Sequence, residues 1–411
     1  MKNPFKSKRP NLKLAVISIL IFIGVVFWRC DSEDPVPTAF APTPYEFPDL
    51  PFFPTDLNIP DDNPMTNEGV QLGRYLFYDG RLSGRTHPDS LMSCGSCHIQ
   101  AQGFECGVDH PKFTGGHPRG LPTSDYPEGK PTPHVMMPMV NLVFNNNGYG
   151  WNGFLHESNQ RTSIPGYDFT GVENLHFKNL EAFTWMAIVA PHEMNGSILK
   201  TEEALRNDPR YGPMFEKAFG TPEINIDRIS LAISQFVRSI VSYRSKFHQW
   251  VRKEATFTAP EQRGHDLFFS EEADCFHCHA GSVLMTNNLY FNNAKDTVFT
   301  DDRDRFSITG DPMDIGAYRA PSLINVELNA PYMHDGRFNT LEEVIDFYSE
   351  GLVYSEHVHP LMKNVNQGGV QLSDEEKADL LAFLKTMTDP ELLTDPKYGS
   401  PFDLGEWSVA N

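Results

Sequence analysis

Two copies of one short cysteine and histidine motif constrain this chain more than any other feature. The first copy is Cys94-Gly-Ser-Cys-His and the second is Cys275-Phe-His-Cys-His. In such a motif two thiols add across the vinyl groups of haem, and the histidine that follows binds the iron. A zinc site would need its cysteine pairs closer together and would not need the histidines. We therefore predict two covalent c-type haems, attached at Cys94, Cys97, Cys275 and Cys278, with His98 and His279 as iron ligands.

Residues 1–30 have the composition of an export signal peptide of the lipoprotein type. Lysine and arginine are concentrated in residues 1–13, and the uncharged stretch that follows is short for a permanent membrane span. Cys30 ends this stretch, and we expect it to carry the lipid, although Arg29 stands where a small residue is usual. An uncleaved anchor is the alternative. Either way the protein is exported to the periplasm or cell envelope and contacts the membrane only through its anchor.

Charge and cysteine content limit the partners and the means of stabilisation. The formal net charge of −20 argues against nucleic acid and anionic membrane surfaces as partners. It suits a basic electron-donor protein, although many exported proteins are simply acidic. Four of the six cysteines are assigned to haem and Cys30 to the lipid, so Cys106 remains alone. Without a disulfide framework, the hydrophobic core must supply the stability.

The chain is long enough for two domains, and its periodicity is mostly helical. We expect a mainly α fold of two cytochrome c-like haem domains with extensive ordered loops. The predicted parts are a signal peptide (1–30), a proline-rich spacer (31–57), an N-terminal peroxidatic haem domain (58–222), a C-terminal electron-transfer haem domain (223–395) and a tail (396–411).

Local patterns place several helices. An apolar stripe predicts one helix over residues 226–252, between the two motifs. Capping boxes at Thr340–Glu343 and Ser373–Glu376 predict two helix starts. Residues 72–77 and 263–269 each predict a short helix before a haem-binding turn, which indicates a duplicated cytochrome c module.

The chain resembles the bacterial di-haem cytochrome c peroxidases and their relative MauG over residues 58–388. The matching stretches are Leu72–Asp79, Ser93–His98, Gly150–Gly153, Pro191–Met194, Glu272–His279, Tyr318–Asn325 and Ala330–Phe338. The resemblance implies that the haem held by His98 is the peroxide site. It also implies that the haem held by His279 stores and relays electrons.

Glu193 matches the distal carboxylate of that family. Peroxide cleavage needs a group that moves a proton from one oxygen to the other. The alternative is a surface glutamate that follows a proline. The neighbourhood departs from the family, since Phe183 replaces a glutamine, Met186-Ala187 replaces glycine-proline, and residues 155–176 are an insertion. The pocket is therefore expected to admit more than peroxide, or to be shaped by a partner.

Two aromatic residues match redox positions of the family. Trp151 matches the tryptophan between the haems, where an indole divides one long electron transfer into two short ones; a buried aromatic is the plain alternative. Tyr348 stands where peroxidases have the methionine ligand of the second haem, and MauG also has tyrosine there. It lies on the apolar stripe of Leu341, Val344 and Ile345, so it is expected to point inward, and a core tyrosine is the alternative. A phenolate would lower the haem potential that a thioether raises.

Other histidines and one further metal complete the expectations. Family peroxidases often rest with a loop histidine on the first haem, but His110, His117 and His134 have no matching spacing, and His87 and His156 are more distant candidates. We therefore expect a five-coordinate first haem, and we expect His277, inside the motif, not to bind iron. The family also implies a calcium ion, at positions matched by Asn141, Asn329 and Pro331, because loop oxygen atoms suit calcium.

Three functions compete. The leading one is reduction of hydrogen peroxide to water with electrons from a small redox protein, a cytochrome c or a cupredoxin. The second is a MauG-like oxidase that uses peroxide to modify side chains of a partner protein, which Tyr348 favours. The third is a non-enzymatic electron carrier, and Glu193 argues against it, because a carrier needs no acid above an open iron.

Overall fold

A computed structural model describes residues 40–84, 91–106, 131–154, 179–300 and 304–403. The predicted signal peptide and the predicted lipidation site Cys30 lie outside these ranges. The chain divides into two units, Met1–Ala41 and Pro42–Asn411, and the helices and strands described below belong to the second. Among the described residues, no helix is both long enough and apolar enough to cross a membrane.

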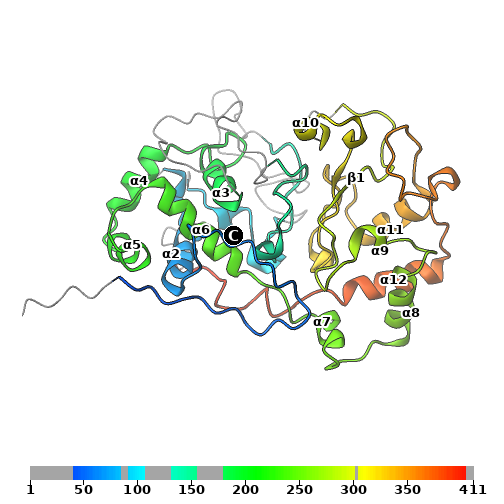
Figure 1. Cartoon of the computed structure of the whole chain (residues 1–411), viewed down its shortest axis with the longest axis horizontal. Coiled ribbons are helices and arrows are strands. Elements are labelled where there is room, and N and C mark those ends of the chain that lie inside the picture. Colours follow the sequence, from blue (N-terminus) through cyan, green and yellow to red (C-terminus); the bar gives the residue numbers. More distant parts are fainter. Residues whose placement is uncertain (1–39, 85–90, 107–130, 155–178, 301–303, 404–411) are drawn as a thin grey trace, which may run out of the picture. The chain divides into compact units, whose positions relative to one another are not determined.

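The described fold is mainly α, as expected (Figure 1). The α-helices are α2 (Asn67–Tyr78), α3 (Asn179–Val189), α4 (Ile198–Arg206), α5 (Tyr211–Phe219), α6 (Ile226–Ser239), α7 (Lys246–Val251), α8 (Ala259–Phe268), α9 (Phe276–His279), α10 (Phe306–Thr309), α11 (Leu341–Glu350) and α12 (Asp374–Lys385). Short 3₁₀ helices are η1 (Gly80–Ser83), η3 (Cys94–Ser96), η4 (Gln100–Gln102), η5 (Leu142–Phe144), η6 (Pro312–Asp314), η7 (Val326–Leu328) and η8 (Val365–Gln367). Strands β1 (Tyr290–Phe291) and β2 (Tyr318–Arg319) pair antiparallel, with Tyr290 opposite Arg319.

Each cysteine motif follows a helix that packs against a second helix at a glycine. α2 packs against α6 at Gly73, and α8 packs against α12 at Gly264 (Figure 1). A Cβ atom at Gly73 would lie 1.9 Å from the carbonyl oxygen of Ala232, and one at Gly264 would lie 2.0 Å from that of Asp379. In both pairs the next residue met is a phenylalanine, whose Cβ would be 2.9 Å away. The predicted duplication is therefore confirmed as a repeated helix pair.

Each helix pair contributes to its own hydrophobic core. The first core is built largely by α2, α3 and α6, and the Trp185 side chain is fully buried in it. The second core is built largely by α8, α11 and α12 around the fully buried Phe383. Cys94 packs against the first core and Cys275 against the second. The two motifs therefore lie against separate cores, as two cytochrome c-like domains require.

The chain contributes to the cores out of sequence order. α6 packs in the first core, although it follows the domain boundary predicted at residue 222. Phe53, in the segment predicted as a spacer, packs in the second core. Residues after α12 return to the first core, and they are Leu392, Tyr398 and Phe402. The predicted domain limits stay predictions.

The expectation of one helix over residues 226–252 is wrong, because α6 and α7 are separate helices. Between them, Oδ2 of Asp389 accepts the backbone N–H of Tyr243 at 3.2 Å and that of Arg244 at 3.1 Å. Ser245 then caps the N-terminus of α7. A carboxylate from beyond α12 thus takes N–H groups that would otherwise bond within a helix.

The two predicted capping boxes are confirmed. Thr340 and Glu343 cap α11, and Ser373 and Glu376 cap α12. In each box the hydroxyl and the carboxylate accept N–H groups that the first helical turn leaves unpaired. Both helices of the second core therefore begin at residues that the sequence specifies locally.

Replacing Gly264 with alanine tests the backbone contact between α8 and α12. The new Cβ would overlap the carbonyl oxygen of Asp379, so the helices must separate, and overpacking of this kind costs roughly 1–3 kcal/mol. We expect a lower thermal midpoint and less haem bound at the second motif. The matched control is Gly212→Ala in α5, whose Cβ would meet its nearest neighbour, Pro222, at 3.9 Å. Equal thermal midpoints for the two variants would contradict the role of the contact.

Candidate active site

A cavity of about 220 Å³ lies against the second cysteine motif. Cys275, Cys278 and His279 line it, and so does Tyr348 of α11. Much of the remaining lining is apolar and includes Leu341, Val344, Ile345, Leu361, Leu380 and Leu384. An apolar cavity that brings these cysteines together with two donors for iron suits a covalently attached haem.

Both motif histidines are prepared to bind iron. The Nδ1 of His98 lies 2.9 Å from the carbonyl oxygen of Phe104, and that of His279 lies 3.2 Å from the carbonyl oxygen of Pro321. A carbonyl can only accept, so Nδ1 carries the proton and Nε2 is left as the ligand atom. Burial lowers the pKa of each histidine to about 4, which keeps both neutral. These residues fit c-type haem at both motifs.

Tyr348 lies where an axial ligand is needed. Its hydroxyl oxygen accepts a hydrogen bond from Nδ2 of Asn293 at 3.1 Å. Burial raises the pKa of Tyr348 to about 12, while the Asn293 hydrogen bond acts in the opposite direction. Met333 and Met362 line the same cavity, so thioether ligands are also within it. The structure brings Tyr348 to the cavity, and its ligation of iron stays a prediction.

Glu193 lies in the turn after α3, close to the first motif. Burial raises the pKa of the Cys94 thiol to about 12, and the nearby charge of Glu193 adds to that rise. The Glu193 side chain keeps 34% of its surface accessible, and Nε2 of His192 lies 3.8 Å from its Oε1. The surrounding protein nevertheless desolvates the carboxylate and raises the pKa of Glu193 to about 7. At neutral pH this group can both accept and return a proton.

Trp151 lies on a loop that contacts both the cavity at the second motif and the first core. Its side chain lines the cavity at the second motif, and its indole N–H donates to the carbonyl oxygen of Val135 at 2.9 Å. Phe154, on the same loop, packs against the first core and contacts Phe183 of α3, with ring centroids 5.9 Å apart. The phenylalanine that replaces the usual family glutamine thus joins α3 to the tryptophan loop by an apolar contact.

The sequence profile of the family described as di-haem cytochrome c peroxidase matches residues 67–256. The cytochrome-c peroxidase IdrP1 of Denitromonas iodatirespirans is 30% identical over 372 residues, which cover 82% of this chain and 87% of that relative. This chain belongs to the di-haem cytochrome c peroxidase family. It therefore contains two c-type haems when mature, in agreement with the two prepared histidines.

Two further matches widen the range of similar proteins. The methylamine utilization protein MauG of Methylorubrum extorquens is 29% identical over 347 residues, which cover 84% of this peroxidase-family chain and 85% of that protein. A crystal structure of a MauG-like protein associated with microbial copper homeostasis has a TM-score of 0.68 and 32% identity, and covers 87% of this chain and 99% of that one. The expected relationship to both peroxidases and MauG is confirmed.

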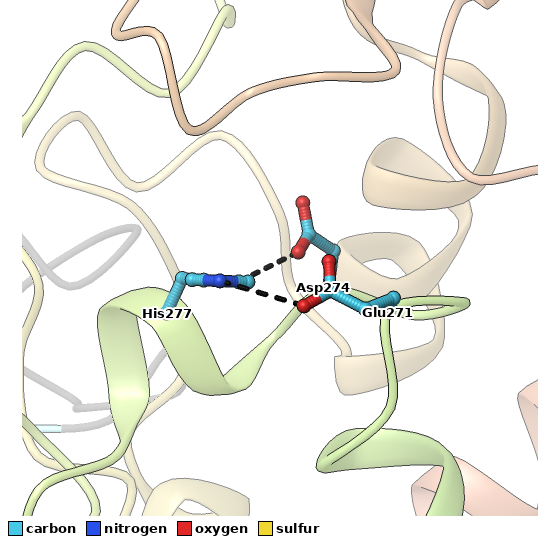
Figure 2. A group of neighbouring side chains, drawn as sticks. All are labelled: Glu271, Asp274 and His277. Carbon is cyan, nitrogen blue, oxygen red and sulfur yellow. Dashed lines mark ion pairs between the residues drawn. The ribbon is translucent and has the colours of Figure 1, made fainter.

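His277, inside the second motif of this di-haem protein, points to a cluster of charges instead of the cavity. Figure 2 shows its ring directed at two carboxylates, with Nδ1 at 2.7 Å from Asp274 and Nε2 at 3.8 Å from Glu271. Lys363 also pairs with both carboxylates, at 2.5 Å from Glu271 and 3.1 Å from Asp274. His277 does not line the cavity. The positive charge of Lys363 thus offsets the two carboxylates.

Of the candidate loop histidines, His134 lies within the described residues, where it contacts residues near the second motif. His134 packs edge-on against Tyr318 and His334, with ring centroids 5.6 Å and 5.2 Å away. Tyr318 and His334 both line the cavity at the second motif. The remaining candidates lie outside the described residues, and they are His87, His110, His117 and His156.

The residues predicted to bind calcium have other contacts. Oδ1 of Asn141 accepts the backbone N–H of Ser242 at 2.9 Å, and its Nδ2 donates to the Ser242 carbonyl oxygen at 3.3 Å. Asn329 is the C-cap of η7, and its backbone N–H donates to the carbonyl oxygen of Val326. Pro331 follows a cis peptide bond. The Asn141 amide thus joins two chain segments, and one lone pair of Oδ1 is left for an ion.

Sequence reasoning missed two residues of the peroxidase site. Asn293 gives no motif signal, since an isolated asparagine in a loop is common. Arg319 belongs to the stretch Tyr318–Asn325 that carried the resemblance, but its role depends on a loop far away in sequence. Only the folded chain brings Asn293 to Tyr348 and Arg319 to the tryptophan loop.

Exchange of Tyr348 tests its predicted ligation. If its oxygen binds the second iron, Tyr348→Met should raise the reduction potential of that haem and introduce the near-infrared band of methionine ligation. Tyr348→Phe should change both the spectrum and the potential. Tyr332→Phe is the control, because Tyr332 lines the same cavity while its hydroxyl donates to the Val326 carbonyl oxygen at 2.9 Å. A Tyr348→Phe protein with an unaltered spectrum would show a core tyrosine and direct attention to Met333 and Met362.

Proposed function

We propose that this protein is an exported di-haem peroxidase that reduces hydrogen peroxide to water with electrons from a small redox protein, a cytochrome c or a cupredoxin. The observation that carries the proposal is Glu193, whose desolvated carboxyl group has a pKa of about 7 and lies close to Cys94. A protein that only carries electrons has no use for such a group. When bound, the haems supply one iron that takes peroxide and a second iron that stores an electron.

Proton movement is assigned to Glu193. Its carboxylate accepts the proton of one peroxide oxygen and returns it to the other, so that the second oxygen leaves as water. A pKa of about 7 allows both transfers near neutral pH. The neutral His98, oriented by the Phe104 carbonyl oxygen, would hold the iron of the first haem through Nε2.

Electron movement is assigned to the second motif and Trp151. His279 is oriented by Pro321 in a cavity that Trp151 also lines. The tryptophan loop continues to Phe154, which packs against the first core. An indole at this place can pass one electron at a time toward the first motif.

A MauG-like oxidation of side chains in a partner protein is the second candidate. The observation that favours it is the position of Tyr348 in the cavity at the second motif, because an anionic oxygen ligand stabilises iron in its more oxidised states. Glu193 serves both reactions and does not separate them. The peroxidase proposal is preferred because the family relatives include several proteins named as peroxidases.

Location and calcium complete the proposal. Export to the periplasm or cell envelope, with a lipid at Cys30, is supported by the composition of residues 1–30. A calcium ion at Asn141, Asn329 and Pro331 is supported by the family resemblance and by the chemistry of oxygen donors.

Glu193→Gln tests the proton transfer. The amide keeps the shape and cannot accept a proton, so peroxide turnover should fall by about 10²–10⁴-fold with unchanged haem content. In the native protein the reactive form is the carboxylate, so kcat/KM for peroxide should rise with pH through about 7 and be lost below it. The variant should lack this dependence. Glu203→Gln, on the exposed side of α4, is the control. A loss under about threefold in Glu193→Gln would mean that another group moves the proton.

Metal analysis tests the calcium proposal. One calcium per protein is expected after gel filtration, and removal by a strong chelator should slow peroxide turnover until calcium is added back. Magnesium should restore less, because it demands a smaller and more regular oxygen shell. Full turnover of protein that contains no calcium would remove this part of the proposal.

A further inference from the structure

Among the described residues, Arg319 is a buried arginine without a carboxylate partner. Only 5% of its surface is accessible, and burial lowers its pKa. Within the described residues, every hydrogen bond of its guanidinium goes to a carbonyl, amide or phenol oxygen. A buried charge paired only with dipoles is costly, so an arrangement that retains it needs a reason.

The oxygen atoms that surround Arg319 come mainly from the loop before Trp151. Its Nη2 donates to the carbonyl oxygens of Asn147 and Gly148, each at 2.6 Å, and its Nε donates to that of Gly150 at 3.4 Å. The backbone N–H of Arg319 donates to the carbonyl oxygen of Trp151 itself at 2.8 Å. Gly148 and Gly150 have positive φ angles of 75° and 77°, which L side chains rarely adopt. The glycines let successive carbonyl groups turn toward one guanidinium.

A tyrosine and a second arginine extend this arrangement past Trp151. Two guanidinium groups lie over the Tyr290 ring, with Arg305 at 4.1 Å and Arg319 at 4.8 Å from its centroid. Its hydroxyl donates to the Asn147 carbonyl oxygen at 2.6 Å. Nη1 of Arg305 donates to the carbonyl oxygen of Asn152 at 2.8 Å. The backbone is therefore held on both sides of Trp151.

The same segment also holds the second motif. Two residues after Arg319, the carbonyl oxygen of Pro321 accepts the proton on Nδ1 of His279. Strand β2 thus contacts the tryptophan loop through Arg319, and Pro321, two residues further along, orients His279. A shift of Arg319 would move Trp151 relative to His279.

We propose that Arg319 is a positioning residue that fixes Trp151 relative to the second haem site and thereby sets the rate of electron transfer between the two haems. The inference rests on the proposed function, because it assumes that electrons pass through Trp151. Lysine keeps the charge but cannot replace the planar fork of donors that arginine directs at several carbonyl groups.

The test uses the full-length, haem-loaded protein and measures electron transfer from the reduced second haem to the first after rapid mixing or a light pulse. Arg319→Lys should slow this step by about 10- to 100-fold, because small misplacements of a reacting group have effects of that size. Its haem content, and the spectrum and potential of the second haem, should match the native protein. Arg337→Lys is the control, since its ion pairs with Asp335 and Asp296 do not involve the loop.

A second variant keeps the inference testable if Arg319→Lys binds haem poorly. Tyr290→Phe removes only the hydroxyl that contacts Asn147 and Arg319, and it should slow inter-haem transfer measurably with both haems in place. A native rate in Tyr290→Phe together with failed haem binding in Arg319→Lys would overturn the inference in favour of a purely structural arginine.

Trp151→Phe separates this inference from the function on which it rests. If Trp151→Phe slows inter-haem transfer, the further change Arg319→Lys in that background should add little. Slow transfer in Trp151→Phe with native transfer in Arg319→Lys would overturn the positioning role alone. Native transfer in Trp151→Phe would overturn the tryptophan route together with the inference. Absence of peroxide turnover in a protein with normal inter-haem transfer would instead remove the proposed function.

Discussion

In both halves of the described chain, a glycine lets the helix before the cysteine motif contact another helix backbone to backbone. Gly73 and Gly264 leave no room for a Cβ atom, so each helix pair has essentially one way to pack. The cysteine motif that follows each helix is therefore placed against the core of that helix pair. In that place His98 and His279 contact the carbonyl oxygens of Phe104 and Pro321, which orient them.

Burial has a different chemical result for each titratable group of the site. It keeps the two motif histidines neutral, which a metal ligand requires. It brings the pKa of Glu193 near neutrality, which a proton shuttle requires. For Tyr348 it favours the neutral phenol, and the hydrogen bond from Asn293 partly offsets this. The same physical effect thus suits two residues to bind iron and a third to exchange protons near neutral pH.

Features fixed by neighbouring residues could be predicted from the sequence. The two cysteine motifs, the capping boxes of α11 and α12, and the inward direction of Tyr348 all depend on short spacings. Features fixed by distant residues could not be predicted. Asp389 divides the helix expected after residue 226, Asn293 reaches Tyr348, and Arg319 holds the loop of Trp151. In each case one polar side chain acts on a segment that its own sequence neighbourhood does not identify.

The order in which the chain builds its two cores affects how the protein unfolds and evolves. The first core is completed by α6 and by residues from Leu392 onward, and the second includes Phe53 from near the start of the described chain. A cut at residue 222 would leave both cores incomplete. The two haem modules are therefore expected to unfold together as one cooperative unit. Recombination that exchanged one module for another would have to transfer these crossing segments as well.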